Sequence, residues 1–367
     1  MKLFNMNTKK FIPWFLFCLT LIVNINVVNA QQFISSSNKF IDYEGRTIDT
    51  ANAKLLSWPG TSVTIRFKGN FLNATLMDTD TSDYFNIILD KKVYNRIHIE
   101  NFKKEYTLVD KLPNGTHTVE LFKLTESTDG NCLFFGFTSN VQAELLKPLR
   151  KAKRIEFYSN SITCGYGVED TVQDRGTGFY KNNYLSYAAL TARKFNAHYA
   201  CIAKSGIGVT VSWFPLVMPE MYDRSTENNA FRKWDFKKWA PEIVVINLFQ
   251  NDAWITNMPE YPEYIHRFKG MQLSDSFFIS QYKNFVSEIR AKYPFAKIIC
   301  SIGSMDASKK GSKWVTYIKE AIKQKSDPKI FLLVYPYKQT PGHPKVKEQK
   351  KMANLLISFI SKHQLWK

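Results

Sequence analysis

The segment RIEFYSNSITCGYG, residues 154–167, joins an apolar run to a glycine-rich turn. Residues 154–158 have the apolar and aromatic content of a buried strand. Gly165 and Gly167 follow closely and indicate a tight turn, because glycine accepts backbone conformations that other residues avoid. Ser161 stands where the strand should break. A serine at this junction is the first candidate for a reactive side chain.

Downstream of this segment, apolar runs alternate with helical patterns. Strands are predicted at residues 154–158, 199–203, 243–249, 297–301 and 330–335. A helix is predicted near residues 278–289, where apolar side chains recur at spacings of three and four, and another apolar stripe runs along residues 346–360. This alternation predicts a mostly parallel sheet with helices on both sides, in an α/β domain over residues 150–367.

Residues 31–145 show a different pattern, with short alternating segments and no long helix. Val63, Ile65 and Phe67 alternate with polar residues, as in a strand with one buried face. The turn Pro113-Asn114-Gly115 predicts a hairpin between the runs at residues 106–109 and 119–121. We therefore expect an all-β sandwich of the jelly-roll type, followed by a connection at residues 141–153. A chain of 367 residues is long enough for two such domains.

The first thirty residues have the composition of an export signal. Three lysines precede the apolar stretch at residues 11–23, and Val28-Asn29-Ala30 is a sequence that a signal peptidase accepts. A membrane anchor is the competing interpretation, but the apolar part is short for a bilayer and two asparagines follow it. The sequence predicts a signal peptide at residues 1–30, a secreted or periplasmic protein, and no membrane span after cleavage.

The chain that remains after cleavage would be strongly basic. The formal charge is +18, and removal of the signal takes three lysines, which leaves +15. A basic protein can bind polyanions, but these lysines are spread along the chain and no nucleic-acid motif is present. A solvated, lysine-rich surface is therefore favoured over nucleic-acid binding. The four cysteines outside the signal are widely spaced, which favours buried free thiols over disulfides or a zinc site.

Polar residues follow the first three predicted strands of the α/β domain. Ser161 follows the first strand, Ser205 and Gly206 follow the second, and Asn251 and Asp252 follow the third. In parallel sheets, the loops beyond the carboxyl ends of the strands form the site. We therefore expect these residues to open into one crevice.

Three of these residues, Ser161, Gly206 and Asn251, fit the chemistry of a serine nucleophile, which needs a base and donors for a developing oxyanion. His343, within the sequence GHP, can take the proton of Ser161 and return it to a leaving alcohol. The backbone N–H groups of Ser161 and Gly206 and the side-chain amide of Asn251 can act as the donors. Taken singly, each residue is better explained as a cap, a turn or an exposed loop position. Their order and their places at strand ends reverse this preference and favour a serine esterase.

The motifs SNSITCGYG, SGIG, FQND and GHP resemble the sequence blocks of the SGNH/GDSL hydrolase superfamily. The chain is similar to carbohydrate esterase family 2, which joins a jelly-roll domain to an SGNH domain. ITCGYGVED, VMPEMYDR and WAPEIVVINL resemble the catalytic domain of that family, and SWPGTSVTIRFKG and LPNGTHTVELFKLTE resemble its leading domain. The resemblance implies a three-layer, flavodoxin-like sheet, with Ser161 as nucleophile, His343 as base, and Ser161, Gly206 and Asn251 as oxyanion donors.

The resemblance also implies a reaction and a substrate class. It indicates removal of acetyl groups from plant polysaccharides such as xylan or mannan, or from their oligosaccharides, without a metal or another cofactor. Trp213 and Trp254, each close to a motif, are the candidates for stacking on sugar rings. Ordinary packing is the alternative role for either tryptophan.

Three departures from the family pattern bear on activity. Ser159-Asn160-Ser161 stands where the superfamily has Gly-Asp-Ser, and Phe249 replaces the first glycine of Gly-Thr-Asn-Asp. Loss of a glycine can alter a turn, because Cβ disfavours positive φ. Thr340 stands three residues before His343, where many relatives have the triad aspartate. A Ser-His dyad is therefore expected, with the imidazole oriented by a backbone carbonyl or by another acceptor.

Three functions remain open from the sequence. The first is an exported carbohydrate O-acetylesterase, with the polysaccharide and the sugar position undetermined. The second, suggested by the departures, is a catalytically weak or inactive carbohydrate-binding protein on the same scaffold. The third is an esterase for lipids or peptidoglycan, which is disfavoured because no apolar lid for long acyl chains is recognisable.

Overall fold

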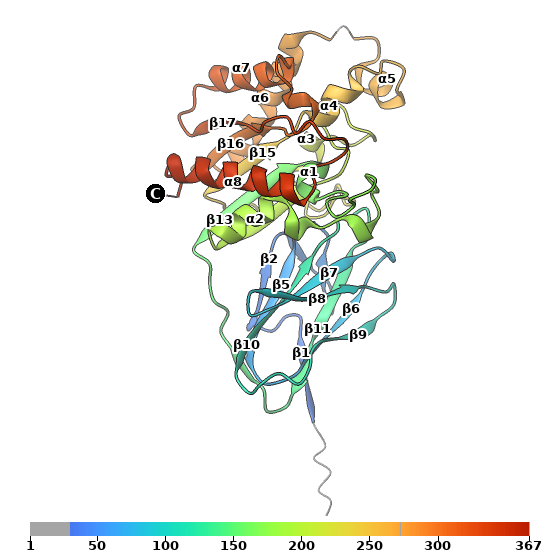
Figure 1. Ribbon diagram of the computed structural model, residues 1–367, viewed down its shortest axis with the longest axis vertical. Helices are drawn as coiled ribbons and strands as arrows, with labels where there is room; N and C mark the ends of the chain where they lie inside the picture. Colours follow the sequence, from blue (N-terminus) through green and yellow to red (C-terminus); the bar gives the residue numbers. More distant parts are fainter. Residues whose placement is uncertain (1–29, 272, 367) are drawn as a thin grey trace, which may run out of the picture.

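The computed structural model describes residues 30–271 and 273–366. The predicted signal peptide therefore lies outside the described residues, apart from Ala30. None of the helices in the described part is both long enough and apolar enough to cross a bilayer. Figure 1 shows two domains stacked along the long axis, an all-β domain at one end and an α/β domain at the other.

The N-terminal domain is a β-sandwich of two antiparallel sheets. One sheet has the order β3-β4-β11-β6-β9 with β1 beside β11, and the other has the order β12-β5-β10-β7-β8 with β2 beside β5. The strands are β1 (Gln31–Ser35), β2 (Ile41–Glu44), β3 (Thr47–Asp49), β4 (Lys54–Leu56), β5 (Ser62–Lys68), β6 (Leu72–Met77), β7 (Tyr84–Leu89), β8 (Lys92–His98), β9 (Lys104–Val109), β10 (Thr116–Lys123), β11 (Cys132–Asn140) and β12 (Glu144–Leu146).

The sandwich follows the predicted pattern of burial. Val63, Ile65 and Phe67 of β5 are fully buried between the sheets, as expected for alternate residues of a half-buried strand. The predicted hairpin at residues 113–115 is wrong. β9 pairs with β6 in one sheet and β10 pairs with β5 and β7 in the other, so this turn crosses between the two sheets. The predicted connection also contains β12, which pairs with β5 before residues 147–152 lead into the second domain.

The second domain contains a parallel five-stranded sheet with the order β14-β13-β15-β16-β17. Its strands are β13 (Lys153–Ser159), β14 (Ala197–Ala203), β15 (Ile243–Asn247), β16 (Lys297–Ile302) and β17 (Ile330–Val334). Its α-helices are α1 (Ser161–Cys164), α2 (Tyr187–Lys194), α3 (Met218–Met221), α4 (Gln250–Ile255), α5 (Pro262–Phe268), α6 (Asp275–Lys292), α7 (Lys313–Lys325) and α8 (Val346–Lys362), and short 3₁₀ turns lie at Gly178–Tyr180, Asn183–Leu185 and Asp306–Ser308. All five predicted strands are confirmed.

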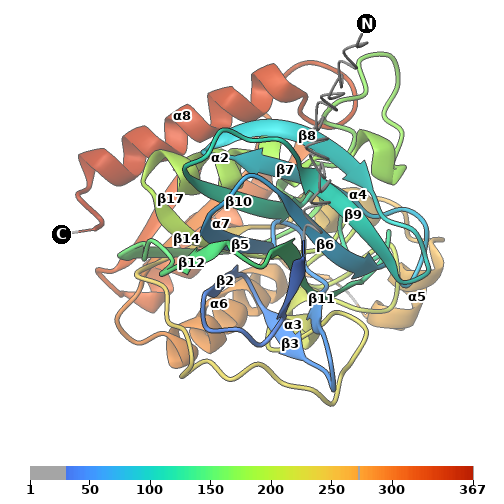
Figure 2. The ribbon, with the colours of Figure 1, turned by 90° about the horizontal axis from the view of Figure 1, so that it is seen from below.

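Helices cover both faces of this sheet, which confirms the three-layer arrangement. α6 and α7 pack on one face and α2 and α8 on the other (Figure 1). The predicted helical stripe forms the buried side of α6, through Phe278, Tyr282, Phe285, Val286 and Ile289. Seen from below, α8 extends beyond the outline of the β-sandwich (Figure 2). The four cysteines in the described residues are buried and unpaired, as predicted.

The strand order places β13 at the reversal of the sheet. The chain passes from β13 to β14 on one side and later to β15 on the other side. Loops that leave neighbouring strands in opposite directions at such a point leave a crevice between them. The carboxyl end of β13, where Ser161 follows, is therefore the natural place for a site.

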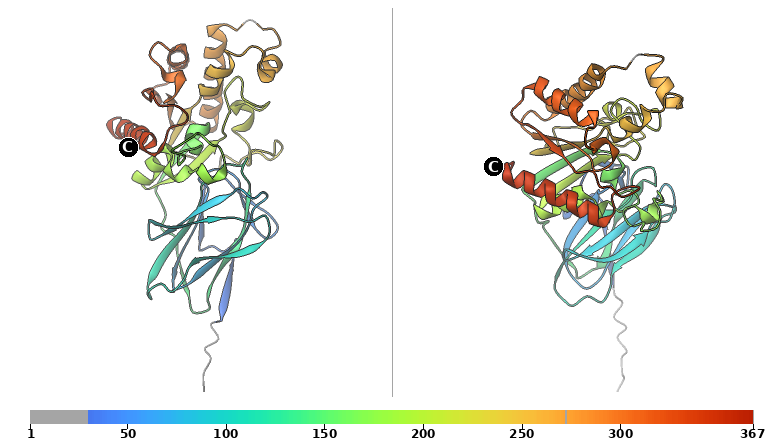
Figure 3. Two further views of the ribbon diagram at one scale, coloured as in Figure 1. Left: turned by 45° about the vertical axis from the view of Figure 1, so that its right-hand side comes forward. Right: turned by 45° about the horizontal axis from the view of Figure 1, so that its top comes forward.

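A buried arginine joins the two domains, which Figure 3 shows meeting end to end. Arg46, between β2 and β3, is only 1% exposed. Its guanidinium donates to Glu156 Oε1 at 3.0 Å and to the Tyr158 hydroxyl at 2.9 Å, both on β13. It also donates to the backbone carbonyls of Tyr222 and Arg224 at 2.6 and 2.9 Å. A buried charge is tolerated only when it is paired in this way, so the contact fixes how the domains meet.

Candidate active site

Ser161 is the first residue of the one-turn helix α1, directly after β13. Asn160 caps this helix: its backbone is extended, with φ −120°, and its side-chain oxygen accepts from the Ile162 N–H at 3.1 Å. Gly165 ends the helix in the left-handed region, at φ +77°, where a Cβ would lie 2.4 Å from the carbonyl oxygen of Asn182. The first N–H groups of a helix have no acceptor inside it, so the Ser161 N–H remains available.

Ser161, His343 and Asp174 form a continuous chain of hydrogen-bonded side chains. His343 Nε2 lies 2.8 Å from Ser161 Oγ, and His343 Nδ1 lies 2.6 Å from Asp174 Oδ2. The Asp174 carboxylate also accepts the backbone N–H of His343 at 3.1 Å and the Lys345 ammonium at 2.9 Å. The expected Ser-His dyad is therefore corrected to a three-residue arrangement. The third member comes from the loop after α1, 169 residues before the histidine.

The electrostatic surroundings of Asp174 keep it ionised. Partial burial acts to raise the pKa of Asp174, but the hydrogen bond and charge of His343 and the ammonium of Lys345 outweigh it. The pKa of this carboxyl is therefore held well below its usual value. An ionised carboxylate accepts the Nδ1–H of a neutral imidazole, which leaves Nε2 free to accept the hydroxyl proton of Ser161.

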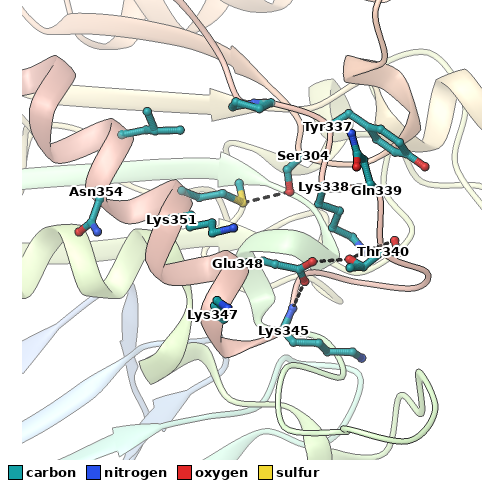
Figure 4. Close-up of a pocket in the computed structure, with 13 residues that line it drawn as sticks. Ser304, Tyr337, Lys338, Gln339, Thr340, Lys345, Lys347, Glu348, Lys351 and Asn354 are labelled. Atoms are coloured by element: carbon teal, nitrogen blue, oxygen red, sulfur yellow. Dashed lines mark hydrogen bonds between the residues drawn. The ribbon is translucent and has the colours of Figure 1, made fainter.

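Thr340, three residues before His343, does not take part in this chain. Its hydroxyl is hydrogen-bonded to Glu348 at the start of α8 and accepts from Lys338 Nζ at 2.9 Å (Figure 4). Glu348 Oε2 in turn accepts the Lys345 N–H at 2.8 Å. Thr340 therefore bonds to Lys338 and Glu348 and does not orient the imidazole.

Gly206 and Asn251 lie beside Ser161, as predicted. Gly206 has φ +85°, a conformation that a residue with a Cβ would adopt only with strain, and no acceptor contacts its N–H among residues 30–271 and 273–366. Asn251 Nδ2 donates to the Ile207 carbonyl at 2.7 Å, and its Oδ1 accepts from Trp213 Nε1 at 3.1 Å. These contacts fix the amide, and its second N–H remains for a ligand.

Asp252 holds the loop that follows Gly206. The fully buried carboxylate accepts the backbone N–H groups of Val209, Thr210 and Val211 at 2.7–3.3 Å and the Thr210 hydroxyl at 2.7 Å. Burial raises the pKa of Asp252, whereas these donors favour its ionised form. The sequence predicted Asp252 at this crevice, and its observed role is to tie the loop after β14 to α4.

The predicted site residues line one cavity of about 280 Å³. Its walls are Ser161, Tyr166, Ser205, Gly206, Trp213, Phe214, Asn251, Trp254 and His343. Both predicted tryptophans are among them. Their indole N–H groups are already bonded, to Asn251 for Trp213 and to Asp306 Oδ2 at 3.0 Å for Trp254. What they offer a ligand is therefore mainly apolar ring surface.

Sequence reasoning missed three residues at this site: Phe214 and Tyr166, which line the cavity, and Asp174. The Tyr166 ring lies 4.5 Å from the His343 ring, and Asp174 completes the hydrogen-bonded chain. Two glycines leave the space that Asp174 occupies: a Cβ on Gly167 would lie 2.9 Å from its Oδ1, and a Cβ on Gly342 would lie 2.8 Å from its Cγ. The available signal was the pair of glycines, one six residues after Ser161 and one directly before His343, which leave room for a third side chain close to the histidine.

The departures from the family motifs are accommodated locally. Ser159 belongs to β13 and has no positive φ, so replacement of the glycine causes no backbone strain there. Its hydroxyl donates to the Asn247 carbonyl at 2.9 Å. Phe249 does adopt a left-handed conformation, with φ +75°, and its ring is buried 4.9 Å from that of Tyr282 and 5.0 Å from that of Trp314.

A possible cation site elsewhere does not belong to this cavity. Asp42, Glu44 and His198 are the group of potential metal ligands found within the described residues. None of them lines the cavity around Ser161. The Lys151 ammonium is paired with Glu44 and opposes a second cation there.

Comparison with known proteins agrees with the two-domain fold. Residues 43–148 match the family described as carbohydrate esterase 2 N-terminal. The chain is 30% identical over 349 residues to the cellulase/esterase CelE of Acetivibrio thermocellus, an alignment that covers 92% of this chain and 41% of CelE. It is 28% identical to an acetylxylan esterase / glucomannan deacetylase of Cellvibrio japonicus, over 84% of this chain and 86% of the relative.

The solved structures place the whole fold in the same group. A family two carbohydrate esterase from Clostridium thermocellum, solved in complex with cellohexaose, is 30% identical with a TM-score of 0.78. The match covers 89% of this chain and 100% of that chain, so it includes both domains. Residues 43–148 match the N-terminal region of the family, and a family two carbohydrate esterase matches along its whole length at 30% identity. This chain therefore belongs to carbohydrate esterase family 2.

Proposed function

We propose that this protein is an exported carbohydrate O-acetylesterase that removes acetyl groups from plant polysaccharides such as xylan or mannan. One observation carries the proposal: Ser161 Oγ lies 2.8 Å from His343 Nε2, at a cavity that Gly206 and Asn251 also line. A hydroxyl, a base and oxyanion donors in one small cavity are what acyl transfer requires. The names of the relatives support this substrate class.

The proposed reaction has two halves. Ser161 Oγ attacks the acetyl carbonyl while His343 Nε2 takes the hydroxyl proton, and the oxyanion receives hydrogen bonds from the N–H groups of Ser161 and Gly206 and from Asn251 Nδ2. The C–O bond to the sugar then breaks, and His343 returns the proton to the leaving alcohol. Water attacks the acetyl-enzyme in the same way and releases acetate. Asp174 stabilises the imidazolium that forms in each half.

The size and lining of the cavity favour a short acyl group. A volume of about 280 Å³ is close to the lower end of the range of about 300–1,000 Å³ found for sites of drug-sized ligands. The space accepts an acetyl group and part of one sugar, and the rings of Trp213 and Trp254 would contact the sugar. Hydrolysis of octanoyl esters faster than acetyl esters would contradict this choice.

The test of the proposed function is acetate release. Purified protein should release acetate from acetylated xylan, acetylated glucomannan and p-nitrophenyl acetate. Ser161→Ala and His343→Ala should each lower kcat by several orders of magnitude, because members of such a unit act together. Thr340→Ala is the matched control, since Thr340 lies in the same loop as His343 but faces Glu348. Equal turnover by wild type and Ser161→Ala would refute the assignment.

A carbohydrate-binding role without catalysis is the alternative. Its support is the complex of a family member with cellohexaose, together with the departures from the family motifs at Ser159, Asn160 and Phe249. In that case, glycan binding would persist in Ser161→Ala and no acetate would be released by any form. The complete Ser161–His343–Asp174 chain argues for turnover.

Export remains part of this proposal. It rests on residues 1–30, with three lysines, an apolar stretch and Ala30 at the expected cleavage point. Mass spectrometry of protein recovered outside the cytoplasm should find Gln31 at the N-terminus. Recovery of the full chain with Met1 from the cytoplasm alone would contradict export.

A further inference from the structure

A carboxylate from the β-sandwich reaches the wall of the catalytic cavity. Glu126 lies in the loop between β10 and β11 and is completely buried. It accepts the backbone N–H of Ser205 at 2.6 Å and the Ser205 hydroxyl at 2.5 Å. Ser205 lines the cavity and directly precedes Gly206. The contact therefore links one domain to the oxyanion donor of the other.

These two hydrogen bonds restrict the direction of the Gly206 N–H. The turn is closed on one side by the Ile207 N–H, which donates to the Lys204 carbonyl at 3.3 Å. On the other side, the Trp213 N–H donates to the Gly206 carbonyl at 3.1 Å. With Ser205 held through its backbone and its side chain, the peptide that carries the Gly206 N–H has little remaining freedom. A preorganised donor stabilises an oxyanion without reorganisation during the reaction.

Glu126 contacts two further segments of the site. Lys181 Nζ lies 2.9 Å from Glu126 Oε1 and 2.8 Å from Asp129 Oδ2, so it pairs with two carboxylates of the same sandwich loop. The Cys164 thiol, at the end of α1, lies 3.6 Å from Glu126 Oε2. One carboxylate thus touches the oxyanion turn, the helix that begins at Ser161, and the end of the segment that carries Asp174.

The surroundings of Glu126 favour its ionised form. Burial alone would raise the pKa of Glu126, but the Lys181 ammonium and the two hydrogen bonds from Ser205 lower it to about 2. The next residue, Ser127, adds a second contact between the two domains. The Ser127 hydroxyl is hydrogen-bonded to Glu227, and Glu227 is paired with Lys204, the residue before Ser205.

We propose that Glu126 is a positioning residue for catalysis, by which the β-sandwich domain sets the direction of the Gly206 N–H in the oxyanion hole. Glu126 acts through Ser205 and does not touch the substrate. The inference rests on the proposed esterase function, because an oxyanion donor matters only where an oxyanion forms. It assigns a role in the reaction to a domain that supplies none of the reacting groups.

Glu126→Gln is the direct test, because it keeps the length of the side chain but removes its charge and one acceptor. We expect kcat for p-nitrophenyl acetate to fall by about 10- to 100-fold, less than the 10²–10³-fold cost of deleting an oxyanion donor outright. KM should change by less than about threefold, since the ground-state carbonyl depends little on that donor. Ser205→Ala, which removes only the hydroxyl contact, should show a smaller loss of kcat with normal folding.

Arg46→Lys is the matched control for a purely structural role. Arg46 is also a buried charge that bridges the two domains, but its partners, Glu156 and Tyr158, do not line the cavity. This variant should lower the melting temperature and leave kcat within about twofold of wild type. If Glu126→Gln behaved like Arg46→Lys, with a lower melting temperature and unchanged kcat, the positioning role would be overturned.

A second readout follows the oxyanion hole itself. An alkylboronic acid forms a tetrahedral anionic adduct with a catalytic serine, so its affinity reports the donors directly. In Glu126→Gln and Ser205→Ala the affinity should fall by the same factor as kcat, and in Arg46→Lys it should not change. If wild type turns over and binds the boronic acid, and Glu126→Gln binds the boronic acid with the same affinity as wild type, this inference alone is overturned. Wild type that does neither overturns the proposed function as well.

Discussion

Replacement of Asp174 tests the catalytic chain most directly. Its Oδ2 lies 2.6 Å from His343 Nδ1, while Oδ1 accepts from Lys345 Nζ at 2.9 Å and from the His343 N–H at 3.1 Å. In Asp174→Asn, one oxygen remains for the ammonium and the backbone donor, so the amide N–H₂ is directed at Nδ1. The imidazole must then carry its proton on Nε2, which is the tautomer that cannot accept from Ser161.

The size of the expected loss in kcat follows from the charge of Asp174 and from the tautomer of His343. Two unit charges about 4 Å apart interact by about 1 kcal/mol in water and by about 4 kcal/mol at an effective dielectric constant near 20. The Asp174 side chain is 32% exposed and that of His343 is 14% exposed, so an intermediate value of about 2–3 kcal/mol applies to the imidazolium. Asp174→Ala should therefore lose about 30- to 150-fold in kcat. Asp174→Asn should lose at least about tenfold more, because it also enforces the wrong tautomer.

The assay is steady-state hydrolysis of p-nitrophenyl acetate by both variants at neutral pH, with thermal melts to confirm that each is folded. Thr340→Ala serves as the control from the His343 loop and should stay within about threefold of wild type, the range of a surface change. The order wild type, Ala, Asn in falling kcat is the expected outcome. If Asp174→Asn turns over as fast as wild type, or faster than Asp174→Ala, the tautomer argument is refuted.

Four further predictions concern folding, the oxyanion loop and substrate binding. Phe249→Gly should lower the free energy of unfolding by about 2–4 kcal/mol in urea titrations, because loss of the buried ring outweighs relief of about 1 kcal/mol of left-handed strain; an equally stable variant would contradict this. Asp252→Asn should lower both the melting temperature and kcat, since an amide group opposes three N–H donors; an unchanged kcat would show that the loop does not need this anchor. Trp213→Ala should raise KM for acetylated xylan by about fivefold or more while Trp213→Phe raises it less, as expected for a lost ring contact; equal KM values would remove the tryptophan from the binding surface. Glu126 has a folded-state pKa of about 2, and an unfolded glutamate titrates at about 4.3, so the contribution of Glu126 to stability is present above the unfolded pKa and is lost as pH falls toward 2. The gap in melting temperature between wild type and Glu126→Gln should narrow over that range, and a constant gap would contradict the assignment.

The sequence was sufficient to predict most of the site because its residues stand at the ends of neighbouring strands. Ser161, Gly206 and Asn251 follow β13, β14 and β15, and parallel pairing of these strands brings their carboxyl ends together. His343 could be added because a nucleophilic serine needs a base and GHP supplied one. Their convergence follows from topology, which the alternation of strands and helices already indicated.

Asp174 and Glu126 could not be found in the same way. Asp174 lies in a loop without periodic pattern, and it reaches His343 only because Gly167 and Gly342 leave room for it. Glu126 belongs to the other domain, so its contact with Ser205 depends on how two separately patterned units meet. The hairpin at residues 113–115 failed for a related reason: the turn residues identify a reversal of the chain but not which sheet receives the next strand.

The guanidinium of Arg46 has a consequence for any attempt to exchange the domains. Glu156 lies in β13, an interior strand of the parallel sheet, is completely buried, and receives its countercharge from the β-sandwich. An isolated α/β domain, or one fused to a foreign partner, would retain this carboxylate without its cation, at a cost of several kcal/mol. The two halves of the chain are therefore not interchangeable modules, and a chimaera would have to supply an arginine, or replace the glutamate, at this one point.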